Sequence, residues 1–431
     1  MKNTFRSLRG YNYRIWAGGA LVSNIGTWMQ RIAQDWLVLT QLTHNNATAV
    51  GTVMALQFGP QLLLLPLTGF VADHMDRRKL LFATQAALGT LALGLGLLTV
   101  TGLVQLWQVY VFALLLGCVS AFDAPIRQTF ISDLVGEDNL SNAVALNSTS
   151  FNAARMIGPA VAGLLIAAVG CGWVFILNAI SFAAVLYSLT LLRIGELQPQ
   201  HQNKRTRAGL VEGFRYVWSR ADMRTLLLML FLFGTFSLNF AIFISTMAVR
   251  VFHAGAGRYG LLTSTMAIGT VVGALLAAHR ARPRFTLLPL SAGLFGLLLG
   301  IAAMMPDYWL FGVALVGIGM AAQTFTTSTN SYMQLSTEPH MRGRVVAIFL
   351  AIVMGGTPLG APVVGWVADT FGPRWALSMG AAAGLIAAAI GTRYLVKYHQ
   401  LRLDIDAGWP RLRLSEMSLA THASTPQQDN R

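Results

Sequence analysis

Long apolar runs recur along almost the whole chain, and short segments between them hold most of its charged residues. An apolar run of about 20 residues is long enough for a helix to cross the hydrocarbon core of a bilayer. We therefore expect an all-α membrane protein with twelve transmembrane helices in two six-helix bundles. The expected spans are 14–41, 49–72, 79–102, 104–125, 140–168, 172–192, 224–249, 258–279, 285–305, 308–331, 344–368 and 374–396.

The longest polar interruption follows the sixth expected span and predicts a linker between two halves. Inside it, an apolar helical face that includes Phe214 and Trp218 predicts a short amphipathic helix on the membrane surface. Internal repeats between the halves are typical of a two-bundle transporter. The expected organisation is an N-terminal bundle, a cytoplasmic linker, a C-terminal bundle and a disordered cytoplasmic tail, over 1–195, 196–223, 224–400 and 401–431.

Composition agrees with this reading: 55% of the residues are hydrophobic, 11% are charged and the net charge is +14. Lys and Arg concentrate in alternate loops, which predicts that both termini are cytoplasmic. Because the basic residues are dispersed, we expect anionic lipid headgroups and not nucleic acid as their partners. Cys118 and Cys171 suggest neither a disulfide framework nor a metal site. We also find no phosphate-binding loop or nucleophile elbow, so no cofactor and no enzyme activity are expected.

A dense charge cluster follows the second expected span, in Gly69-Phe-Val-Ala-Asp73-His-Met-Asp76-Arg77-Arg78. Gly69 and Asp73 share a helix face, so a neighbouring helix can approach and present its positive N-terminal end to the carboxylate. The pattern resembles the loop between helices 2 and 3 of the major facilitator superfamily, with Asp76 in place of a glycine. The resemblance implies that Asp73 holds an inner gate against helix 11, whose start we place at 342–345. The alternative is a solvated loop that only sets topology.

Ionisable residues inside the expected spans are candidate functional groups, because charge at that depth is costly. Arg31 and Asp35 stand four residues apart in the first span; Asp35 either carries a proton or is neutralised permanently by Arg31. Arg155, in the fifth span, either binds an anionic substrate group or forms a structural ion pair. Asp123 and Arg127, also four apart, suit a local gating or capping role at the cytoplasmic end of the fourth span.

Other polar residues inside the spans are candidates for a substrate cavity, although hydrogen bonds between helices explain many such residues. The complete set of cavity candidates is Asn24, Gln30, Gln34, Asn147, Asn152, Arg155, Asn239, Gln323 and Asn330.

Further motifs narrow the resemblance, among them Asp123-Ala-Pro-Ile-Arg-Gln128 and Arg155-Met-Ile-Gly158-Pro159. They are similar to the branch of the superfamily that contains the enterobactin exporter and the transmembrane secretion effectors. Gly158, Pro159 and Gly163 resemble the helix 5 motif of the superfamily's antiporters. The resemblance implies a monomeric transporter in the bacterial inner membrane that uses the proton gradient to export a small molecule, a siderophore or a drug. Uptake of a metabolite and a receptor or scaffold without transport remain alternatives.

Overall fold

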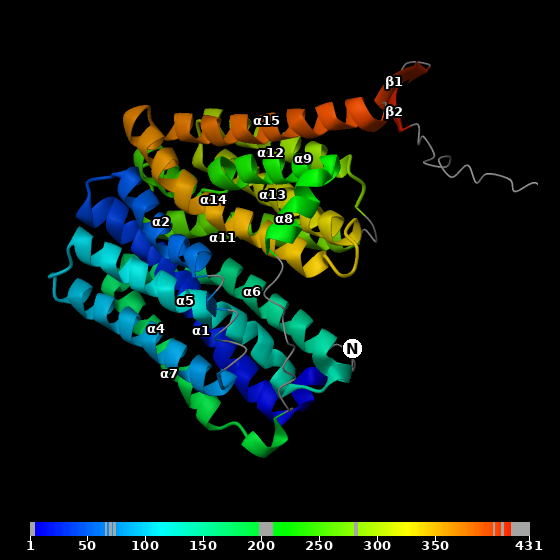
Figure 1. Cartoon of the computed structure of the whole chain (residues 1–431). Coiled ribbons are helices and arrows are strands. Elements are labelled where there is room, and N and C mark those ends of the chain that lie inside the picture. Colours follow the sequence, from blue (N-terminus) through cyan, green and yellow to red (C-terminus); the bar gives the residue numbers. More distant parts are fainter. Residues whose placement is uncertain are drawn as a thin grey trace, which may run out of the picture.

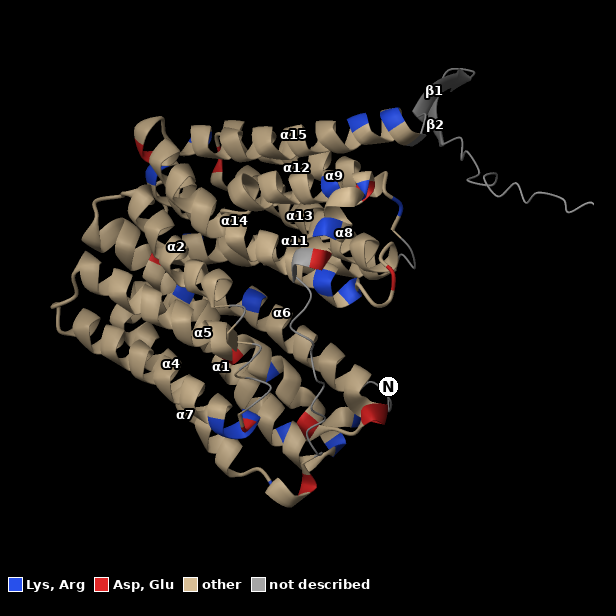
Figure 2. Cartoon of the chain, viewed as in Figure 1, with Lys and Arg blue, Asp and Glu red and all other residues tan. Residues whose placement is uncertain are grey.

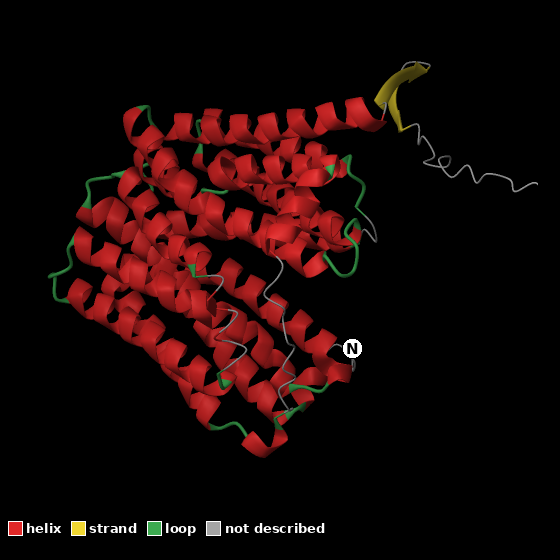
Figure 3. Ribbon diagram, viewed as in Figure 1, coloured by secondary structure: helices red, strands yellow, loops and turns green. Residues whose placement is uncertain are grey.

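The computed structural model describes residues 5–64, 67–68, 71, 75–197, 210–279, 283–399, 401–406 and 409–414. Helices dominate the described chain (Figure 3). Ten of them are long and apolar enough to cross a membrane. The first helix is not one of the ten; it carries Arg31, Asp35 and several of the neutral polar candidates.

Helices from the first part of the chain pack against one another and form what we call the first group. Each expected span before residue 195 falls on one of its helices, and α5 extends further than expected, to Leu134. A short π-helical segment, η2, continues α1. The first group consists of η1 Arg6–Arg9, α1 Tyr11–Trp36, η2 Leu37–Leu42, α2 Ala47–Leu63, α4 Arg77–Val100, α5 Leu106–Leu134, α6 Glu137–Val169, α7 Cys171–Thr190 and η3 Ile194–Glu196.

The second group follows a ten-residue helix, α8 Leu210–Ser219, at the position of the expected amphipathic helix. Its first span is interrupted: π-helical η4 ends at Ser237, and α10 begins at Phe240. The second group consists of α9 Ala221–Leu232, η4 Phe233–Ser237, α10 Phe240–Thr246, η5 Met247–Val251, α11 Ala256–Ala278, α12 Leu287–Met304, α13 Tyr308–Leu335, α14 Arg342–Thr370 and α15 Pro373–His399.

The two groups meet mainly through two helix pairs, α2 with α14 and α6 with α11. In Figure 1 their ribbons come together at the end that holds the start of α2, and they diverge toward the end that holds the N-terminus. We call the first the closed end. Many of the Lys and Arg residues lie toward the other end (Figure 2), where a positive-inside topology requires them. The cytoplasmic location of that end stays a prediction.

The segment after α15 differs from the expected disordered tail. It forms an antiparallel hairpin of β1 Leu401–Asp406 and β2 Trp409–Leu414, in which Asp404 is opposite Arg411. Its signal in the sequence is a period-two alternation of apolar Leu401, Leu403 and Ile405 with charged residues, which is typical of a strand. The hairpin lies after the last helix, and the candidate membrane spans of the described chain are helical, as expected.

Candidate transport site

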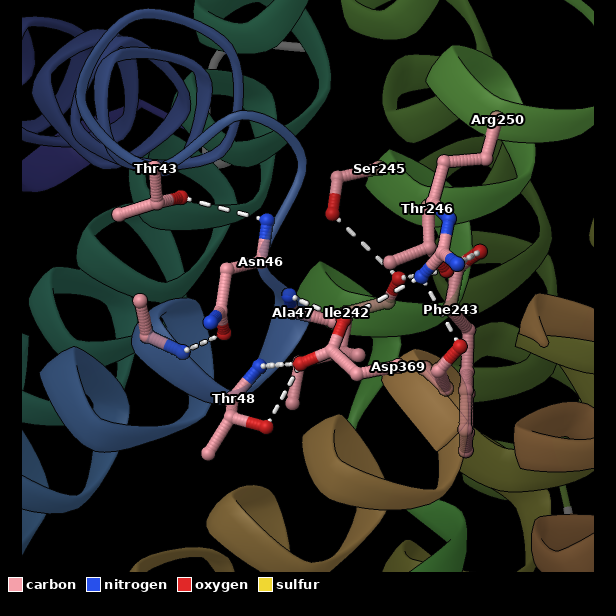
Figure 4. A network of polar contacts seen from close by, with 12 residues as sticks. Thr43, Asn46, Ala47, Thr48, Ile242, Phe243, Ser245, Thr246, Arg250 and Asp369 are labelled. Atoms are coloured by element: carbon pink, nitrogen blue, oxygen red, sulfur yellow. Dashed lines mark hydrogen bonds and ion pairs between the residues drawn. The ribbon is translucent and has the colours of Figure 1, made fainter. Parts of the chain in front are cut away.

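A polar network joins the two groups at the closed end, with Asp369 of α14 at its centre (Figure 4). Asp369 Oδ1 accepts a hydrogen bond from the backbone N–H of Ala47 at 2.8 Å, and Oδ2 accepts from the backbone N–H of Thr48 at 2.8 Å. Oδ2 also accepts from Thr48 Oγ1 at 2.7 Å. The N–H groups in the first turn of a helix have no partner within the helix and carry partial positive charge. Asp369 therefore caps α2 from the opposite group.

Arg250, in η5, completes this network from within the second group. Its Nη1 lies 3.2 Å from Asp369 Oδ1 and donates at 2.9 Å to the carbonyl of Ala368, near the end of α14. The Asp369 carboxylate thus balances one guanidinium and the positive end of α2, and its side chain is 23% exposed. Separation of the groups here would break the three hydrogen bonds from Ala47 and Thr48 to Asp369, while the Arg250 contacts lie within the second group.

Small residues let the helices of the two groups touch beside this network. A Cβ added at Gly365 would lie 2.5 Å from the carbonyl oxygen of Ala47, and one added at Gly51 would collide with the carbonyl of Ala361. In the other pair, a Cβ at Gly163 of α6 would lie 2.7 Å from the carbonyl oxygen of Ala256 in α11. Close packing of this kind stabilises helix pairs in a membrane.

Asp35, in the last turn of α1, also reaches the second group. It is 9% exposed and accepts a hydrogen bond of 3.3 Å from Tyr259 Oη of α11. The rings of Trp36 and Tyr259 stack with their centroids 5.9 Å apart. Asp35 makes no ion pair with Arg31 within the described chain. A permanent ion pair, one of the two readings of this spacing, is therefore not what the structure contains.

Arg31 contacts aromatic rings instead of a carboxylate. Its Cζ lies 4.8 Å from the ring centroid of Trp28 and 5.8 Å from that of Phe58. Arg155 of α6 approaches the same indole, with its Cζ 5.6 Å from the Trp28 centroid. Two cations from different helices thus converge on one aromatic side chain.

Asp123 and Arg127 form the ion pair that their spacing suggests, with 2.6 Å between Arg127 Nη2 and Asp123 Oδ2. The pair extends to two other helices, because Arg127 donates to Asn24 of α1 at 3.0 Å. Thr84 and Gln85 of α4 donate to Asp123 Oδ1 at 2.8 and 2.6 Å. This cluster ties α1, α4 and α5 together inside the first group.

The charged loop before α4 is described only from Met75 onward, so Gly69 and Asp73 lie outside the described residues. Asp76 caps α4 by accepting from the backbone N–H groups of Arg78 and Lys79. Arg77 pairs with Asp133, near the end of α5, at 2.8 Å. Arg78 donates from Nε and Nη2 to the carbonyl of Leu189, near the end of α7. These contacts join the ends of α4, α5 and α7.

Comparison with known proteins identifies this arrangement. A profile of the transmembrane secretion effector family matches residues 3–422. The chain belongs to that family. It is therefore a multi-pass membrane transporter of the major facilitator type, and not an enzyme.

Curated relatives of this transmembrane secretion effector include siderophore transporters. The chain is 26% identical over 353 residues to the staphyloferrin A transporter of Staphylococcus aureus. The aligned residues cover 81% of this chain and 87% of that transporter. It is also 26% identical over 374 residues to the enterobactin exporter EntS of Shigella flexneri, with coverage of 85% and 87%.

Solved structures share the fold at low identity. A bacterial homologue of the lysosomal transporter Spinster, in an inward-facing and occupied conformation, aligns with a TM-score of 0.68 at 15% identity and covers 90% of this chain and 98% of its own. A bacterial homologue of the iron transporter ferroportin, in an inward-facing state, gives a TM-score of 0.68 at 14% identity, with coverage of 89% and 98%.

The remaining cavity candidates of this family member are spread over several helices. Gln30 accepts from Asn178 of α7 at 2.5 Å, and Gln34 Nε2 is buried without a hydrogen-bond partner among the described residues. Asn239 lies at the interruption between η4 and α10 and donates back to the carbonyl of Thr235. The others are half-buried, and those with a side-chain hydrogen bond in the described chain form it within their own helix: Asn147, Asn152, Gln323 and Asn330.

The role of Asp369 was not predicted from the sequence, although a sequence repeat points to it. Gly365-Trp-Val-Ala-Asp369 repeats Gly69-Phe-Val-Ala-Asp73 with one aromatic exchanged for another. Both segments place a glycine one turn before an aspartate near the end of an apolar run. Asp133 and Tyr259, also missed, have no comparable pattern around them.

Proposed function

We propose that the protein is a secondary active transporter that exports a small molecule, a siderophore or a drug-like compound, in exchange for protons. In this proposal its chain crosses the bacterial inner membrane twelve times as a monomer. Two six-helix bundles, 1–195 and 224–400, work by alternating access, with both termini in the cytoplasm. The closed end then faces the periplasm.

The observation that carries this proposal is the Asp369 network at the closed end. It is polar, and only three hydrogen bonds, from Ala47 and Thr48 to Asp369, join the two groups in it, so breaking the network costs a modest free energy. A contact of this kind suits a gate that opens in every transport cycle.

The repeated Gly-x-Val-Ala-Asp segment supplies the opposite gate in this mechanism. At the closed end, Asp369 of α14 caps the start of α2. When that end opens, Asp73, after α2, would cap the start of α14, which begins at Arg342. The two aspartates would therefore act in turn on the same pair of helices.

Asp35 is the proposed proton carrier, since it bridges the groups through Tyr259 without an ion pair to Arg31. Protonation would remove the charge that Tyr259 stabilises and weaken the link between α1 and α11. A carboxyl group whose protonation alters an interdomain contact can couple proton binding to bundle movement.

Everted membrane vesicles test the direction of transport. Vesicles containing the protein should accumulate enterobactin or staphyloferrin A when their lumen is acidified, and a protonophore should abolish the accumulation. Control vesicles from cells without the protein should not accumulate either compound. Accumulation of these compounds only in right-side-out vesicles would show uptake and would refute the proposed direction.

A further inference from the structure

Three side chains of α1 and α6 form a cationic and aromatic cluster that the gates do not use. Arg31 and Arg155 place their Cζ atoms 4.8 and 5.6 Å from the ring centroid of Trp28. Phe151, 46% exposed, makes an edge contact with Trp28, with 5.8 Å between the ring centroids. Arg31, Arg155 and Trp28 are all half-buried, so each remains partly accessible.

The sequence of α6 builds this convergence. A Cβ added at Gly158 would lie 2.6 Å from Trp28 Cβ, so the glycine permits α1 and α6 to touch at the indole. Arg155 precedes Gly158 by three residues and therefore lies on the same face of α6. Its guanidinium is thereby brought to the ring that Arg31 also contacts.

Neither guanidinium has a carboxylate partner in the part of the chain that the structure describes. No ion pair or hydrogen bond involves Arg31 or Arg155 there, and the carboxylate of Asp35, one turn along α1, is directed to Tyr259. By contrast, Arg77 and Arg127 of the first group each pair with an aspartate.

Two adjacent unpaired cations inside a membrane span are costly, because they repel each other and have lost part of their hydration. Cation–π contact with one indole offsets only about 1 kcal/mol. An anion between the guanidinium groups would offset more, since an arginine fork matches the geometry of a carboxylate.

We propose that Arg31, Arg155 and Trp28 form the binding site for an anionic group of the transported molecule. The preferred ligand class is a carboxylate or comparable oxyanion attached to an aromatic body, because the indole and Phe151 provide ring faces and edges beside the two cations. This inference rests on the proposed function for the identity of the ligand as cargo, but the site itself can be tested by binding alone.

The test compares salicylate with salicylamide, which has nearly the same shape but no charge. Both are titrated calorimetrically into the full-length protein in a neutral detergent. Wild-type protein should bind salicylate more tightly. Arg155→Gln and Arg31→Gln should each weaken salicylate binding about tenfold or more, from the loss of a hydrogen-bonded charge. Binding of salicylamide should change little, and Arg155→Lys should lose less than Arg155→Gln.

Arg193→Gln is the matched control. Arg193 also lies over an aromatic ring, 4.3 Å from the centroid of Tyr11, but it pairs with Glu196 outside the spans. This variant should bind salicylate as the wild type does. A melting curve of each variant checks that it is folded. If Arg155→Gln does not fold, Arg155→Lys replaces it in the comparison.

Two results would overturn the site: equal binding of both probes by the wild type, including no binding of either, or unchanged salicylate binding in both glutamine variants. The proposed function fails separately. If the wild type binds salicylate selectively but no proton-driven export is found in vesicles, the site stands and the transport proposal falls. If export is found while both glutamine variants bind salicylate normally, the transport proposal stands and the proposed site falls.

Discussion

Asp369→Asn should shift the protein away from the conformation with its closed end sealed. The substitution keeps the size of the side chain and one carbonyl oxygen, but it removes the negative charge that faces Arg250 and the start of α2. The variant should fold and insert, because the change lies between the two groups and leaves the buried hydrophobic cluster unchanged.

The size of the shift follows from the contacts. A hydrogen bond to a charged group contributes about 1.5 to 3 kcal/mol, and a charge at a helix N-terminus about 0.3 to 2 kcal/mol. Asparagine retains part of this stabilisation, and the Asp369 side chain is 23% exposed. We therefore expect the sealed state to lose about 2 kcal/mol of stability relative to the separated state. At 1.4 kcal/mol for each factor of ten, the population ratio of sealed to separated states should fall about 30-fold.

Spin-label distances across the closed end measure this ratio. Labels would be placed at Leu103 in the first group and Trp375 in the second, each 65% exposed, after replacement of Cys118 and Cys171. In nanodiscs, Asp369→Asn should add a population at longer distance. Labels on the same two sites of the otherwise unchanged protein give the reference distribution.

Asp307→Asn is the control for this experiment. Asp307 also caps a helix, accepting from the backbone N–H groups of Trp309 and Leu310, but that helix belongs to its own group. It should leave the distance distribution unchanged. If Asp369→Asn also leaves it unchanged, or moves it no more than Asp307→Asn does, the gating role of Asp369 is refuted.

The remaining predictions concern the other gate, the proton site and the linker. Asp73→Asn should abolish export with near-normal insertion, as measured in vesicles, and normal export would remove the inner-gate assignment. Asp35→Asn should abolish proton-driven export while ligand binding by calorimetry persists; pumping restored by adding Arg31→Ala to Asp35→Ala would show that the pair is structural. Co-expressed fragments 1–200 and 201–431 should recover some export, and stable, associated fragments without any export would give the linker a further role.

The sequence predicted the positions of the helices well, because length and apolarity are local properties. Helix α14 begins at Arg342, within the expected start at 342–345. A clear error is at α5, expected to end at 125 but continuing to Leu134. Its last turns carry Arg127, which pairs with Asp123 of the same helix and donates to Asn24 of α1, and Asp133, which pairs with Arg77 of α4. Hydropathy cannot detect such partners.

Side-chain partners were harder to predict than helices. The four-residue spacing of Arg31 and Asp35 allows an ion pair, but each side chain contacts a different helix instead: Arg31 reaches Phe58 and Asp35 reaches Tyr259. At Asp123 and Arg127, the same spacing does give an ion pair. Spacing on one helix predicts which groups can meet, while packing of neighbouring helices decides whether they do.

The central claim is that protons and a small molecule cross the membrane in opposite directions through this protein. The most direct measurement follows both in the same proteoliposomes, with a pH-sensitive dye inside and a downhill gradient of enterobactin or staphyloferrin A. The account predicts that outward movement of one of these compounds drives protons inward, and that Asp35→Asn abolishes the proton movement. Flux of either compound with protons in the same direction, or with no proton movement, would contradict it.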